Sequence, residues 1–162
     1  MTPTHVFALC AGYVAGGLVG LLGLLHLVWA LGAPWPARDR EQLAAYVMPQ
    51  VMPGQGARAR LRGDFPSRAM TLAAMCAFFA MSACLVAPEI VARLLPGARW
   101  LVLGIAAVFA LRGGGGLLFW SRRRESTRRA APSPFFRYNR RFYSPACLVI
   151  ATLAAVSATT QP

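Results

Sequence analysis

Long apolar stretches alternate along this chain with shorter stretches that are rich in arginine. A soluble helix needs a polar face, so charged residues recur along it every few positions. Four windows here have almost no charge, at about residues 6–32, 69–87, 100–120 and 142–160. Each meets or approaches the roughly 20 apolar residues that cross a bilayer. Because the windows lack the alternation of barrel strands, the pattern predicts membrane-spanning helices.

The fourth window is the shortest, since its apolar stretch begins only at Pro145. It reaches the length of a normal span if its helix starts upstream, near Phe142, or if the bilayer thins locally. Ser144 followed by Pro145 is typical of an N-cap and the first helical position. We therefore predict an all-α fold: a polytopic membrane protein that forms a four-transmembrane-helix bundle, with residues 1–162 as a single membrane domain.

The two longer connections are the basic loops 33–68 and 121–141. In the first, residues 39–48 have the pattern of a short interfacial helix, with Leu43, Tyr46 and Val47 facing the membrane. Ser67 is a plausible N-cap for the second span. In the second loop, aromatic residues mixed with arginines precede the fourth window, which is typical of the membrane–water interface.

The charge of the chain is strongly positive, at +12, and comes from 17 arginines without any lysine. On a soluble protein this balance would suggest nucleic acid. Here six arginines lie in the first basic loop, eight in the second and only two in the short loop between the second and third windows. The positive-inside rule then predicts a multi-pass protein of the cell membrane, with both basic loops cytoplasmic and both termini outside. We expect anionic lipid headgroups, rather than nucleic acid, as partners of these loops.

The first window carries a stripe of small residues that would let another helix approach closely. At about 100° per residue, its four glycines fall within a stripe about 80° wide. His26 lies about 40° from the start of this stripe and should face the interior, with Trp29 one turn further on. The glycines are Gly12, Gly16, Gly20 and Gly23.

Arg112 is the one charged residue within the third window, and the glycine run 113–116 follows it. It lies about 12 Å from the cytoplasmic end of its helix, and His26 about 9 Å from the end of its own. A charge at this depth normally faces a partner or a water-filled cavity. We therefore predict a polar pocket, open to the cytoplasmic leaflet, around His26 and Arg112. Its predicted rim residues are Asp64, Tyr138, Asn139, Tyr143 and Ser144.

Each of these residues also has a simpler interpretation. In this interpretation, His26 only bonds a backbone carbonyl, and Arg112 extends to the headgroups. The glycines 113–116 serve close packing alone, and Asp64 pairs with a loop arginine. No group of His, Cys, Asp or Glu has metal-ligand spacing, so we expect neither a metal nor a cofactor.

Three stretches resemble domain-of-unknown-function family 3995, a family of small bacterial membrane proteins with four predicted helices. They are residues 25–32 (Leu-His-Leu-Val-Trp-Ala-Leu-Gly), residues 111–113 (Leu-Arg-Gly) and residues 136–147, which include Tyr143-Ser144-Pro145. The chain has Asn139 where such proteins often carry an aspartate, which puts an acid–base role for that position in doubt. The resemblance implies the four-helix architecture and a role for His26, Arg112 and Tyr143, but no activity.

Three functions remain open from the sequence. The first is binding of an anionic amphiphile or lipid, with Arg112 pairing with the acidic group, His26 donating a hydrogen bond, and Trp29 and Tyr143 packing the apolar part. The second is a structural or accessory subunit of a membrane complex. The third is a lipid-modifying enzyme that uses His26, which is less favoured because no acidic residue lies in any window to orient the histidine. A protein partner and a homo-oligomer both stay open.

Overall fold

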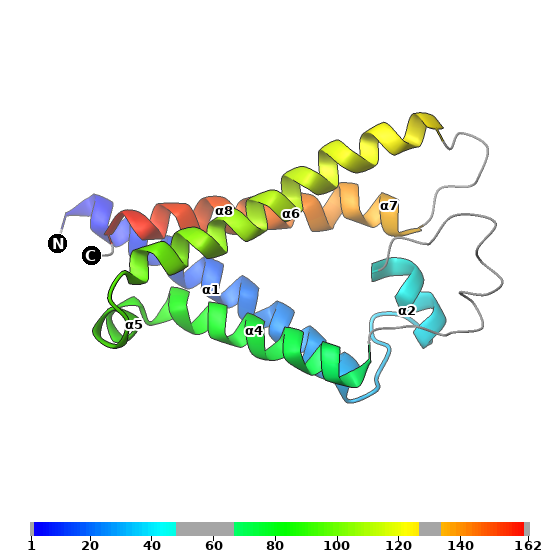
Figure 1. Ribbon diagram of the computed structural model, residues 1–162, viewed down its shortest axis with the longest axis horizontal. Coiled ribbons are helices and arrows are strands. Elements are labelled where there is room, and N and C mark those ends of the chain that lie inside the picture. Colours follow the sequence, from blue (N-terminus) through cyan, green and yellow to red (C-terminus); the bar gives the residue numbers. More distant parts are fainter. Residues whose placement is uncertain (1, 48–66, 127–133, 161–162) are drawn as a thin grey trace.

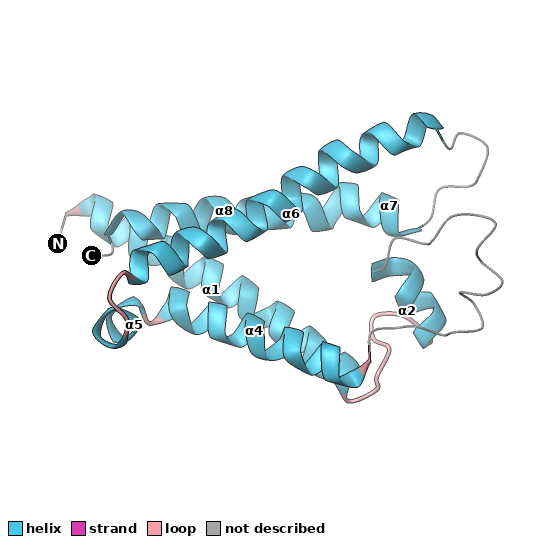
Figure 2. Cartoon of the chain, in the orientation of Figure 1, coloured by secondary structure: helices cyan, strands magenta, loops and turns pink. Residues whose placement is uncertain are grey.

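The fold was obtained as a computed structural model, which describes residues 2–47, 67–126 and 134–160. Every regular element within these ranges is helical, and they contain no strand (Figure 2). The α-helices are α1 (Pro3–Ala30), α2 (Arg40–Val47), α4 (Arg68–Val86), α5 (Pro88–Leu94), α6 (Ala98–Ser126), α7 (Pro134–Tyr138) and α8 (Ser144–Ser157). A π-helix, η1 (Asn139–Tyr143), joins α7 to α8, and a 3₁₀ turn, η2 (Ala158–Thr160), follows α8.

Three of these helices are long and apolar enough to cross a membrane, which indicates a multi-pass membrane protein. They are Pro3–Ala30, Arg68–Val86 and Ala98–Leu118, with mean hydropathies of 2.0, 2.1 and 1.9. They correspond to the first three predicted windows, although α6 continues to Ser126, into the predicted second basic loop. The fourth span is not confirmed, because α8 alone has 14 residues and about 20 are needed. It stays a prediction.

The long helices pack as two antiparallel pairs, α1 with α4 and α6 with α8, and α1 also contacts α8 (Figure 1). The pairs meet at the end that holds both termini and α5, and they diverge toward α2 and α7. The buried apolar core lies in the half where the pairs meet. Its larger members are Val19, Leu85, Val102, Ile105, Phe109 and Ile150.

The predicted glycine stripe is the surface of α1 that contacts α4. A Cβ at Gly16 would overlap Val86 Cγ2 and lie 3.2 Å from the Ser82 carbonyl oxygen, and one at Gly23 would lie 3.1 Å from the Phe79 ring. The Ser82 hydroxyl donates a 2.8 Å hydrogen bond to the Gly16 carbonyl across the two helices. Small residues thus allow both the close approach and the bond between helices.

The predicted short helix in the first basic loop exists as α2, and Asp39 caps it by accepting a 2.8 Å bond from the Gln42 N–H. Its apolar side, however, packs on α7 instead of facing a membrane. Leu43 is only 1% exposed, and the Tyr46 ring meets the Tyr138 ring edge-on at 5.2 Å. The apolar side of α2 was predicted to contact lipid and instead contacts protein. An amphipathic helix can bury its apolar side equally well against either one, so the sequence pattern is the same.

The fourth helical segment starts earlier than predicted. Its backbone is helical without interruption from Pro134 to Thr160, so Ser144 is not an N-cap. Pro145 falls inside this helix, where it has no N–H and its ring would clash with the carbonyl four residues before it. The π-helix just upstream relieves this conflict, because its wider turn displaces the carbonyl. The Ser144 N–H accordingly bonds the carbonyl of Asn139, five residues back.

Candidate functional site

A group of polar side chains meets around Gly116, one helical turn beyond Arg112 on α6. A Cβ at Gly116 would lie 3.0 Å from Arg112 Nη1 and 3.0 Å from Asn139 Nδ2, and it would overlap Ser144 Oγ. The three side chains come from α6, η1 and α8. We call Arg112, Gly116, Asn139 and Ser144 the Gly116 cluster. Glycine is what allows the three polar groups to converge, because any side chain at position 116 would occupy their meeting point.

Within the cluster, Asn139 binds the backbone of α6 directly. Its Nδ2 donates a 3.2 Å hydrogen bond to the Gly116 carbonyl. Asn139 is 1% exposed and Ser144 is fully buried, yet Asn139 Oδ1 and Ser144 Oγ have no hydrogen-bond partner among the described residues. Such groups are uncommon in folded proteins, since each gives up its bond to water. Two unmade hydrogen bonds therefore lie next to the guanidinium of Arg112.

Arg112 itself is the exposed member of the cluster. It lies just beyond Phe109, the last member of the buried core along α6. No acidic residue occurs in α1, α4, α8 or the apolar part of α6. The arginine thus places a cation just beyond the buried core on α6, with no carboxylate in α1, α4, α8 or the apolar part of α6 to neutralise it.

His26 belongs to a second group, on α1. Its Nδ1 lies 2.7 Å from the Leu22 carbonyl oxygen, so Nδ1 must carry the proton, since a carbonyl only accepts. The imidazole packs between the rings of Trp29 and Phe78, each at a centroid distance of 4.9 Å. The backbone bond is the simpler of the two interpretations of this histidine, and in a neutral imidazole it leaves Nε2 as the acceptor.

The other predicted site residues lie near these two groups or outside the described residues. Trp29 is buried, and its Nε1 donates a 2.7 Å bond to the Trp35 carbonyl. Tyr143 packs against the rings of Tyr138 and Phe135, both at 6.4 Å. Asp64 lies outside the described residues.

The structure therefore brings Arg112, Asn139 and Ser144 together, and it holds His26 and Trp29 together. Within the described ranges, no hydrogen bond or ring contact joins the first group to the second. Sequence reasoning missed Gly116 as the meeting point and Phe78 as the partner of His26. The i to i+4 spacing of Arg112 and Gly116 could have indicated the first, since such residues lie on one helix face.

The run of four glycines packs closely at its two ends. A Cβ at Gly113 would lie 2.8 Å from Leu148 Cγ and 2.9 Å from the Ser144 carbonyl oxygen, whereas Gly114 and Gly115 have nothing within 4 Å. The helix α6 stays regular through all four positions. Close packing of α6 on η1 and α8 thus accounts for the outer two glycines, and the structure gives no reason for the inner two.

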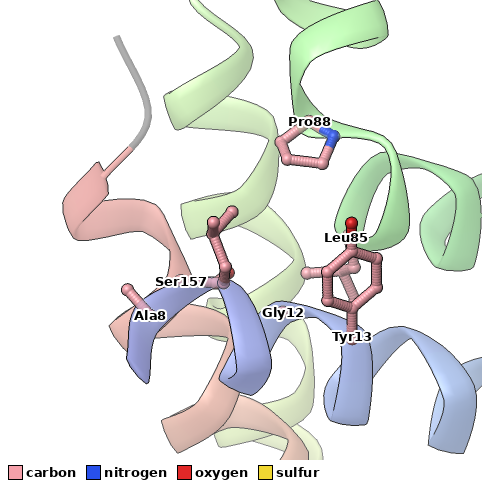
Figure 3. Close-up of a pocket in the computed structure, with 7 residues that line it drawn as sticks. Ala8, Gly12, Tyr13, Leu85, Pro88 and Ser157 are labelled. Carbon is pink, nitrogen blue, oxygen red and sulfur yellow. The ribbon is translucent and has the colours of Figure 1, made fainter. Parts of the chain in front are cut away.

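A small cavity lies at the opposite end of the molecule, near the termini (Figure 3). Its volume of about 10 Å³ is roughly what one water molecule requires, so it does not fit an amphiphile. Its lining residues are Ala8, Leu9, Gly12, Tyr13, Leu85, Pro88 and Ser157.

Comparison with known proteins gives one match. The family model described as protein of unknown function (DUF3995) matches residues 19–154, a range that includes both polar groups. No curated protein and no solved structure matches the chain.

Proposed function

The chain belongs to the DUF3995 family, and from its own residues we propose that it is a four-span membrane protein that binds an anionic amphiphile through Arg112. The observation that carries the proposal is an exposed arginine, deep in an apolar span, beside two buried polar atoms that have no partner among the described residues. A charge within the bilayer costs about 3 kcal/mol even by the lower scales. An anionic headgroup that pairs with the arginine would offset that cost.

Four spans are supported by the course of the last helical segment. From Pro134 to Thr160 it is helical throughout, about 40 Å at 1.5 Å per residue, which exceeds the 30 Å hydrocarbon thickness. It packs beside α6 and returns the chain to the end that holds the N-terminus (Figure 1). Together with the positive-inside rule, this arrangement supports a topology with both basic loops in the cytoplasm and both termini outside.

We expect a reporter fused to the C-terminal end of the chain to lie outside the cell. An alkaline phosphatase fusion, which is active only there, should show activity, and a green fluorescent protein fusion should be dark. The same reporters placed after Ser126 should give the opposite result. A fluorescent C-terminal fusion would mean three spans and would contradict the fourth.

The ligand proposed for Arg112 is an amphiphile held from the cytoplasmic leaflet. Its acidic group would pair with the guanidinium, next to Asn139 and Ser144. Its apolar part would pack on the aromatic side chains of Trp29 and Tyr143. His26 Nε2 would accept a hydrogen bond, in place of the donor role that the sequence suggested. Asp64 has no part in this proposal. The arginine-rich loops would hold anionic lipids at the membrane surface, with an attraction of about 1 kcal/mol for each arginine.

Native mass spectrometry of the protein, purified in mild detergent, tests this function. The wild type should carry a discrete extra mass of an anionic amphiphile, and Arg112→Ala should lose at least nine-tenths of it, since bonds to charged groups contribute about 1.5–3 kcal/mol each. Arg99→Ala, an exposed arginine at the other end of the same helix, is the matched control and should keep the ligand. Equal adducts on all three proteins would exclude binding at Arg112.

A structural role is the second candidate, and the position of Arg112 against η1 favours it. In that case the guanidinium would join α6 to the π-helix and so present a rigid surface to a protein partner or a second copy. Arg112→Ala would then lower the melting temperature and change partner capture without any loss of ligand. The structure gives less support to an enzyme, because a carbonyl, and no carboxylate, orients His26.

A further inference from the structure

The two unpaired atoms of the Gly116 cluster restrict the chemistry of the anion, and this inference rests on the proposed binding function. Of the two amide atoms of Asn139, only Nδ2 can donate to the Gly116 carbonyl, so the orientation of the amide is fixed and Oδ1 is the atom that has no partner within the described ranges. An amide oxygen accepts and never donates. A ligand that satisfies it must therefore bring a hydrogen-bond donor of its own.

The other members of the cluster favour an acceptor. Arg112 has donors alone, and the Ser144 hydroxyl can either donate or accept. Arg112 Nη1 and Asn139 Nδ2 each lie 3.0 Å from one point, the place of a Cβ on Gly116, so they are at most twice that distance apart. Asn139 Oδ1 belongs to the same amide group as Nδ2, so we expect one small group on the ligand to carry both an anionic oxygen and an O–H.

We propose that the group bound at Arg112 is a phosphate monoester that carries one proton. Its anionic oxygens would accept from Arg112 and Ser144, while its P–O–H would donate to Asn139 Oδ1. A phosphodiester and a carboxylate both bring negative charge, but neither has a donor on the charged group. With a second pKa of about 6, a monoester keeps this proton in a large fraction of molecules under mildly acidic conditions. The same chemistry could come from a lipid headgroup or from free phosphate.

Two lipids that differ in one methyl group test the assignment. Dioleoyl phosphatidic acid is a monoester, and dioleoyl phosphatidylmethanol has the same chains and an anionic phosphate without an O–H. In titrations followed by native mass spectrometry at pH 6, wild type should bind the monoester at least tenfold more tightly, the effect expected for one hydrogen bond to a charged group. Asn139→Ala should reduce this preference to about twofold or less.

Ser144→Ala is the matched variant, because its hydroxyl would donate to an anionic oxygen that both lipids share. It should weaken both lipids by a similar factor and leave the preference intact. Without ligand, its melting temperature should not fall, since the hydroxyl has no partner to lose in the part of the chain that the structure describes. A lower melting temperature together with unchanged lipid affinities would mean that Arg112 uses Ser144 as a structural contact, and would overturn the proposal.

The remaining outcomes distinguish a failure of the phosphate monoester from a failure of anion binding at Arg112. If wild type binds both anionic lipids equally and Arg112→Ala loses both, the monoester is wrong and anion binding stands. If neither lipid binds better than dioleoyl phosphatidylcholine, the proposed function fails as well. Given a preference for the monoester, displacement by inorganic phosphate at millimolar concentration supports a free phosphate as the natural source, and resistance to it supports a lipid.

Discussion

Replacing Gly16 with leucine is expected to separate α1 from α4 and to lower the melting temperature of the protein strongly. Even a Cβ at this position would overlap Val86 and press on the Ser82 carbonyl, and leucine adds three further carbons. Overpacking costs about 1–3 kcal/mol for small insertions, and the Ser82–Gly16 hydrogen bond would be lost with it, about 0.6 kcal/mol. Together these cost about 2–4 kcal/mol of the 5–15 kcal/mol that stabilises a typical protein, and leucine, as a larger insertion, adds to the overpacking.

The neighbouring glycine provides the control for this change. A Cβ at Gly17 has nothing within 4 Å, so Gly17→Leu should give protein of normal yield and melting temperature. Size-exclusion chromatography and thermal unfolding in detergent would compare the two variants, with Gly16→Ala expected between them. Similar melting temperatures for Gly16→Leu and Gly17→Leu would contradict the close packing of α1 on α4.

The four consecutive glycines of α6 are expected to respond to alanine in two opposite ways. Gly113→Ala should destabilise the protein by about 1–3 kcal/mol, because the new methyl would press on the Ser144 carbonyl in a packed interface. Gly116→Ala should do the same and also spread the Gly116 cluster apart. At Gly114 and Gly115 the new methyl has nothing within 4 Å. Alanine there should therefore leave the stability unchanged or raise it, by up to about 1 kcal/mol through its higher helix propensity.

Thermal unfolding of the four single variants, in one detergent and at one pH, measures this pattern. The outer two should melt below wild type and the inner two at or above it. Gly116→Ala should in addition bind less of the ligand that wild type carries. Four equal melting temperatures would show that helix propensity alone decides the effect, and that α6 does not approach η1 and α8 as closely as described.

Much of the fold was predictable because long apolar windows in the sequence indicate which helices are able to cross a membrane. The bounds of three spans, the Ser67 cap, which accepts from the Met70 N–H at 3.3 Å, and the face of the glycine stripe follow from hydropathy and the 100° repeat. The start of the fourth segment did not follow. The local sequence Ser144-Pro145 is compatible both with the start of a helix and with a position just after a π-helix. The contacts that distinguish the two come from α6, which is distant in the sequence.

The individual residues of the site were predictable, but which of them contact one another was not. Depth and helix face placed His26 and Arg112 at a similar level, and Asn139 and Ser144 were predicted only as residues of the rim. A helical wheel describes each helix alone, however, and does not say which helix lies opposite. The structure places Arg112 against η1 and α8 and His26 against Phe78 of α4, so the predicted single pocket becomes two groups on two helix pairs.

The π-helix also sets the register of everything that precedes it in the last helical segment. Its wider turn holds one residue more than an α-helical turn would. Deleting one residue within 139–143 would restore an ordinary helix and turn the preceding residues by about 100° around its axis. Tyr138, which now meets Tyr46 of α2, would rotate away, and the exposed Arg137 would rotate with it. A single inserted residue therefore determines whether the aromatic or the arginine side of this helix faces α2.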